Sequence, residues 1–191
     1  MLDHVFTDAI DALRVAMEEA RLERQALEER FQADVLLGDI TWETTYGLPG
    51  EGTPPRARAD VRLDWTTWSQ TAYRDWILGT EIDEPPRIDV EVTYRVQSLD
   101  SPPDPQRLLA AMPAVSPILG TEELDRSGPT IEASYTDGLD AVSHAVEVTY
   151  EGSYPLDEEA LGDGSTLDKH FSAMGGWIAS TLVTLSDIVL D

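Results

Sequence analysis

Three segments in the first half of the chain alternate apolar and polar residues, and this pattern predicts strands. The segments are 40–46, 58–65 and 88–96. In 58–65 the odd-numbered residues are apolar and the even-numbered residues are Arg or Asp. Alternate side chains of a strand lie on opposite faces of a sheet, so this strand is expected to have one buried face and one charged, solvated face.

A spacing of three and four residues between apolar positions predicts two long amphipathic helices, at 1–31 and 165–190. The same spacing predicts short helices at 68–78 and 107–112. A further pair of alternating segments near 130–154 predicts an antiparallel hairpin.

The last helix raises the question of a membrane anchor, because Asp187 is the only charged residue in 171–190. Its central glycines and hydroxyl residues, and the lack of basic residues beyond Lys169, favour a buried helix instead. Gly175 and Gly176 each cost about 1 kcal/mol relative to Ala inside a helix. Close backbone packing at these glycines is the expected compensation.

The order of these elements indicates an α+β fold. We expect a single domain over 1–191, in which 32–152 form a mostly antiparallel sheet with short helices. Long N-terminal and C-terminal helices are expected to cover that sheet.

The charge of the chain indicates the solvent in which it folds. It has 37 acidic and 13 basic residues, a formal net charge of -24, and Lys169 is its only lysine. Multimolar salt would screen this repulsion, because the Debye length falls to about 3 Å at 1 M. Carboxylates hydrate strongly, whereas lysine exposes a long apolar stem. The composition therefore favours a halophilic protein of a salt-accumulating organism or its virus over an ordinary acidic protein.

Composition and motifs also exclude several functions. The chain has no cysteine, so disulfides and thiolate chemistry are excluded. The negative charge argues against direct contact with nucleic acid. No phosphate-binding glycine loop, nucleophile elbow, HExxH motif or EF-hand loop occurs. We therefore expect no catalytic, cofactor-binding or metal-binding residues. We also expect that the protein is not an enzyme.

Three candidate groups have simpler structural explanations. His144 shares its strand face with apolar residues and is expected to be half-buried. The acidic run at 157–163 could hold Ca²⁺ or Mg²⁺, but a solvated loop is the expected explanation in so acidic a chain. The aromatic cluster is expected to pack in the core, with an aromatic-lined ligand cavity as the alternative. This cluster consists of Trp65, Trp68, Tyr73 and Trp76.

Self-association is expected at two places. Val15 and Leu22 lie seven residues apart, outside the main apolar stripe of the first predicted helix, and are either an outer stripe for contact between subunits or isolated surface residues. A loop rich in Gly and Pro follows the first strand. The predicted interface residues are Val15, Leu22, Leu48, Pro49, Gly50, Pro54 and Pro55.

The order of elements resembles the small neck and tail-completion subunits of tailed viruses, of the tail-terminator type. The resemblance rests on a helix at 9–20, strands with a long hairpin loop at 40–63, a strand before a helix at 87–112, and closing strands at 130–135 and 144–150. The helix at 68–78 and the last helix are not part of that pattern. The resemblance implies a ring-forming subunit without an active site.

The sequence thus predicts a non-enzymatic structural subunit of a larger assembly, such as a neck or tail ring of a haloarchaeal tailed virus. Its expected partners are copies of itself and other assembly proteins, with no membrane and no cofactor. Its expected location is the cytoplasm of a salt-accumulating host, or the virion. The alternative is a helix-grip-like ligand-binding or chaperone-like domain of a halophile.

Overall fold

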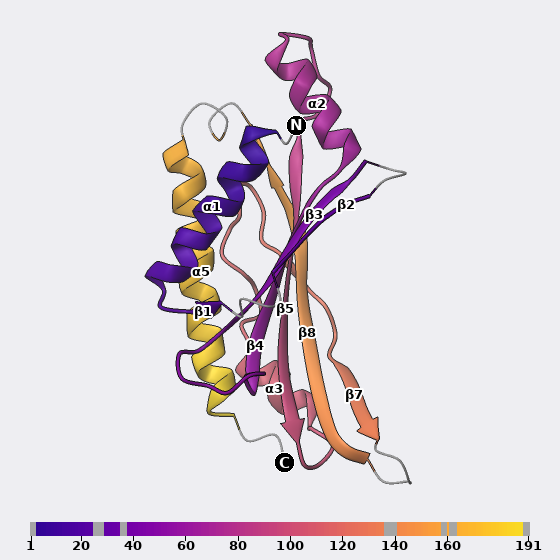
Figure 1. The fold of residues 1–191 in the computed structure, drawn as a ribbon, viewed down its shortest axis with the longest axis vertical. Helices are drawn as coiled ribbons and strands as arrows, with labels where there is room; N and C mark the ends of the chain where they lie inside the picture. Colours follow the sequence, from indigo (N-terminus) through magenta and orange to yellow (C-terminus); the bar gives the residue numbers. More distant parts are fainter. Residues whose placement is uncertain are drawn as a thin grey trace.

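An antiparallel sheet of eight strands organises the fold (Figure 1). The computed structural model describes residues 3–24, 29–34, 38–135, 141–157, 160 and 164–188. The strands are β1 (Glu23–Arg24), β2 (Arg30–Ala33), β3 (Ile40–Gly47), β4 (Ala57–Trp65), β5 (Arg87–Leu99), β6 (Asp125–Arg126), β7 (Thr130–Tyr135) and β8 (Ala141–Pro155). The helices are α1 (His4–Glu19), α2 (Thr67–Ile77), α3 (Pro105–Ala111) and α5 (Gly164–Ser186).

The long strands β3, β4, β5 and β8 form the middle of the sheet in that order, and each neighbouring pair is antiparallel. At one side, β1 and β2 both pair with β3. At the other side, β6 and β7 both pair with β8. The alternation predicted for β4 is confirmed, because Ala59, Val61, Leu63 and Trp65 are fully buried, whereas the residues between them are not.

Helices α1 and α5 lie side by side against one face of this sheet (Figure 1). The apolar stripe of α1, which includes Phe6, Leu13 and Met17, is fully buried. In α5, Phe171 and Ile178 are fully buried as well. These side chains and the inward residues of the strands form one core, so the prediction of a buried rather than a membrane-anchoring helix is confirmed.

The first helix is shorter than the predicted 1–31. Helix α1 ends at Glu19, and Arg21 has a left-handed backbone with φ of 59°. Leu22 then turns into the core with 7% exposure, so the prediction that it lies on an outer helical stripe is wrong. Phe31 belongs to β2 and lies opposite Trp42, because pairing with β3 overrides the local helical spacing. Residues 25–28 lie outside the described part.

Helix α2 confirms the predicted helix at 68–78. Thr66 is the N-cap and accepts a hydrogen bond from the backbone N–H of Ser69. Gln70 donates its side-chain amide to the Gly38 and Trp65 carbonyls. At the other end Gly79 has φ of 73°, the left-handed conformation typical of the residue that follows a helix.

The predicted α+β fold with a mostly antiparallel sheet is confirmed. The sheet extends beyond the predicted 32–152, since β1 begins at Glu23 and β8 ends at Pro155. None of the helices in the described ranges combines the length and the apolarity needed to cross a bilayer.

Candidate functional site: the uncovered face of the sheet

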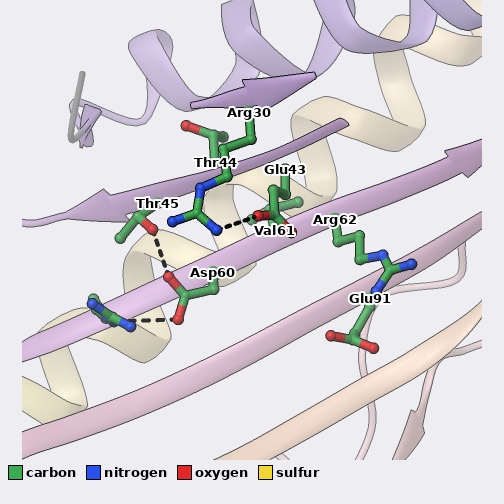
Figure 2. Close-up of a pocket in the computed structure, with 9 residues that line it drawn as sticks. Arg30, Glu43, Thr44, Thr45, Asp60, Val61, Arg62 and Glu91 are labelled. Atoms are coloured by element: carbon green, nitrogen blue, oxygen red, sulfur yellow. Dashed lines mark hydrogen bonds and ion pairs between the residues drawn. The ribbon is translucent and has the colours of Figure 1, made fainter. Parts of the chain in front are cut away.

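The face of the sheet opposite α1 and α5 carries no helix in the part of the chain that the structure describes. Figure 2 shows the middle of this face, with the helices behind the strands. We call it the uncovered face. It is formed by the outward side chains of β3, β4, β5 and β8, which are Thr41, Glu43, Thr45, Arg58, Asp60, Arg62, Asp64, Asp89, Glu91, Thr93, Arg95, Glu147, Thr149 and Glu151, joined by Arg30 and Arg87.

Arginine and acidic side chains are paired along and across the strands of the uncovered face. Arg62 approaches Asp64 with two nitrogens, Nε at 2.8 Å and Nη2 at 3.0 Å. One strand away, Arg95 donates to Glu147 and to Glu132, the latter at 2.7 Å. Bidentate contacts of this kind are the stronger form of ion pair. Ion pairs therefore order much of the uncovered face, although the strand register also places Arg58 opposite Arg95 and Glu91 opposite Glu151.

Asp60 shows how the strands position these groups. Its Oδ1 accepts a hydrogen bond of 2.6 Å from Thr45 on the neighbouring strand, and its Oδ2 lies 3.2 Å from Nε of Arg58 on the same strand (Figure 2). Residues i and i+2 of a strand lie on one face, which brings Arg58 and Asp60 together. Arg62 with Asp64, and Arg87 with Asp89 at 3.7 Å, repeat this spacing.

The pKa values on this face follow from the pairing. The hydrogen bond to Asp64, with the Coulombic attraction of nearby carboxylates, raises the pKa of Arg62. Burial would lower the pKa of Arg95, but its contacts with Glu132 and Glu147 outweigh burial and raise it. Burial raises the pKa of Asp89 despite the opposing effect of Arg87. The arginines are therefore permanently charged partners of the carboxylates.

A shallow hollow of about 340 Å³ lies at the centre of the uncovered face (Figure 2). Three arginines and three carboxylates line it, so its formal charge is zero, whereas the whole chain carries -24. Five of the chain's arginines lie on this face: Arg30, Arg58, Arg62, Arg87 and Arg95. Against the seven carboxylates of this face, these five arginines leave it a formal charge of -2, so it can contact another protein with less repulsion than the strongly acidic remainder of the chain.

The predicted interface residues fall into three groups: exposed, half-buried and buried. Val15 is 54% exposed, and Pro49, Gly50 and Pro54 are exposed, so these positions are accessible to a partner. Leu48 is half-buried against the core.

Leu22 and Pro55 are buried, so they cannot be contact residues. Pro55 lies against Gly47, where its ring atoms would be 3.1 Å from a Cβ at that glycine. Folding back of the hairpin loop onto the end of β3 explains its burial.

The prediction that the aromatic cluster packs in the core is confirmed only in part, for Trp65 and for the half-buried Tyr73, whereas Trp68 is 44% exposed. Trp65 is fully buried and stacks on Phe6 with ring centroids 6.0 Å apart. Tyr73 and Trp76 line an open hollow of about 230 Å³. Ligand cavities usually have volumes of about 300 to 1,000 Å³, so this hollow is small for a ligand site. Trp68 lies outside the cluster, with the Arg87 guanidinium 5.2 Å from its ring centroid.

In the described part of the chain, the histidines and the acidic run do not come together in one site. His144 is half-buried, as predicted, and the Tyr154 hydroxyl lies 3.0 Å from Nδ1 of His170. Within the described ranges, no three His, Asp or Glu side chains are arranged to hold a metal ion. Asp157 accepts the backbone N–H of Ala160, and the remaining acidic residues of 157–163 lie outside the described part.

Comparison with protein-family models, with curated proteins and with solved structures gave no match.

Proposed function

We propose that the protein is a non-enzymatic structural subunit of a larger protein assembly, and that the uncovered face is a contact surface for a neighbouring protein. The balanced charge of the hollow at the centre of this face supports the proposal most strongly. Apposed like charges repel across an interface even in salt, so an acidic protein that assembles needs a region from which excess acid is absent. The hollow at the centre of the uncovered face, with three arginines and three carboxylates, is such a region.

The ion pairs also hold the side chains of this face in place before a partner binds. Arginine side chains that are already held by carboxylates lose less conformational freedom when a partner docks. Threonines between them, such as Thr93 and Thr149, whose hydroxyls are 2.9 Å apart, offer donors and acceptors without charge. This face therefore suits a polar protein interface more than a small-molecule site.

We further propose that the assembly is a ring in the neck or tail of a haloarchaeal tailed virus. The resemblance in element order supports this, and so does the acidic composition. The protein would then be found in the cytoplasm of the salt-accumulating host and in the virion. The exposed positions Val15, Pro49, Gly50 and Pro54 remain candidate contacts with other assembly proteins.

Light scattering after size exclusion in multimolar KCl tests the proposal. A structural ring subunit is expected to elute as a discrete multimer. A monomer that takes up an apolar dye would contradict it and would favour the helix-grip-like ligand-binding domain, with the hollow beside Tyr73 and Trp76 as the binding place.

A further inference from the structure

The outer strands β2 and β7, on opposite sides of the sheet, are exposed along their whole length. All four residues of β2 and all six residues of β7 are exposed. Among the described strands, β2 pairs only with β3, and β7 pairs only with β8. The outer side of each strand therefore presents backbone N–H and C=O groups that another strand can pair with.

The two edge strands, β2 and β7, each carry an exposed apolar side chain on the same side of the sheet. On the side of the sheet that carries the helices, Phe31 of β2 is 52% exposed and Ile131 of β7 is 46% exposed. Phe31 lies opposite the buried Trp42, and Ile131 lies opposite the buried Val146, which places both on that side. An exposed apolar side chain is thus available at each edge, on the same side of the sheet.

The uncovered face has a matching pair of charges. Arg30 of β2 lies opposite Glu43, and Glu132 of β7 contacts Arg95, so both point to the uncovered face. Within their strands, Arg30 is the only charged residue of β2, and Glu132 is the only charged residue of β7. Pairing β2 with β7 brings opposite charges together, whereas pairing β2 with β2 or β7 with β7 brings like charges together.

Strand direction also fits. The path β2-β3-β4-β5-β8-β7 contains six strands joined by antiparallel pairings only. With an even number of alternating strands, β7 of one copy placed beside β2 of the next continues the alternation. The helices of both copies then remain on the same side of one continuous sheet.

We propose that copies of this chain associate head to tail by antiparallel pairing of β7 with β2, which extends the sheet from one subunit to the next. Such a contact is heterologous, and repetition of it closes into a ring when the rotation between copies permits. The inference rests on the proposed function, since it names the contact between copies in the assembly.

Cysteine cross-linking tests this contact, because the chain has no cysteine of its own. The double variant Phe31→Cys/Ile131→Cys is treated with a short bismaleimide in multimolar KCl. The two positions lie at opposite edges of one subunit, so a link between them joins two copies. We expect a ladder of covalent multimers from the double variant and uncross-linked chains from either single variant. A Phe31→Cys/Val183→Cys variant is the matched control, because Val183 is 50% exposed but lies on α5, and no ladder is expected.

Three outcomes overturn the proposal. A covalent dimer from a single variant would show pairing of like edges. A multimeric particle without cross-links in the double variant would refute the β7–β2 contact and leave the proposed function standing. A monomeric mass for the unmodified chain would refute both.

Discussion

Gly175 of α5 packs directly on the backbone of Ala16 in α1. A Cβ built on Gly175 would lie 2.8 Å from the Ala16 carbonyl oxygen and 3.0 Å from its carbonyl carbon. Real Cβ atoms do not approach backbone atoms so closely, so only glycine lets the two helices pack at this separation. The predicted reason for a glycine inside this helix is thereby confirmed for Gly175.

Gly175→Ala is expected to destabilise the protein by about 1 to 3 kcal/mol, as overpacking of a tight contact does, because α1 and α5 must move apart. Gly176→Ala is the matched control. Gly176 is exposed and has no neighbouring atom within 4 Å of a built Cβ, so alanine there is expected to stabilise the helix by up to about 1 kcal/mol. Urea unfolding in multimolar KCl measures both. Equal effects of the two substitutions would contradict the packing argument.

Arg95→Met is expected to cost about 2 kcal/mol of unfolding free energy, because it leaves the carboxylates of Glu132 and Glu147 without their shared cation. The Arg95 side chain is only 18% exposed, so water compensates poorly. Arg107→Met is the control. Its ion pair with Asp104 is more exposed, and a loss below about 1 kcal/mol is expected. A loss at Arg95 no greater than that at Arg107 would argue against an ordered charge array.

Glu29 is expected to make stability depend on pH on the acid side. Burial would raise its pKa, but hydrogen bonds from Arg14 and Trp42 outweigh burial and lower it. The stability that this carboxylate contributes is present above its unfolded pKa of about 4.3, and it is lost as pH falls through the lower folded pKa.

The unmodified chain should therefore be more stable than a Glu29→Gln variant at neutral pH, and the difference should shrink as the pH falls below about 4. Glu19→Gln, at an exposed position of α1, controls for the loss of one negative charge. Unfolding free energies of the three proteins across this range provide the measurement. A difference that stays constant with pH would contradict the assignment.

Salt is expected to raise the unfolding temperature strongly. With a net charge of -24, repulsion destabilises the compact state until counterions screen it. Circular dichroism during heating, at KCl concentrations from millimolar to multimolar, measures the effect. Sucrose is the control, because it favours burial without screening charge. Equal stability in low salt and in multimolar KCl would show that the acidic surface needs no screening.

The strands were predictable where burial of one face dictates the sequence. In β4 and β5 the alternation extends over many residues, and no helical spacing competes with it. The same alternation predicted a charged outer face on β4. The short strands β1, β2 and β6 were missed, because two to four residues carry too little pattern, and pairing with distant strands decides their conformation.

The candidate site was predictable only in part, for a physical reason. Arg58 and Asp60 share a face by their spacing alone, but the contacts of Asp60 with Thr45 and of Arg95 with Glu147 depend on which strands are neighbours. Which strands lie at the edges depends on the same long-range pairing. Burial by tertiary packing depends on it too, and the sequence pattern alone does not show it. The prediction that Leu22 and Pro55 are contact residues is therefore wrong, because both are buried.

The particle mass of the unmodified chain, measured first in multimolar KCl and again after transfer to low salt, tests the central claim most directly. The account predicts one discrete multimer in high salt and its dissociation when screening is withdrawn. A single-chain mass in multimolar KCl, with the chain folded, would contradict the claim that this protein is an assembly subunit.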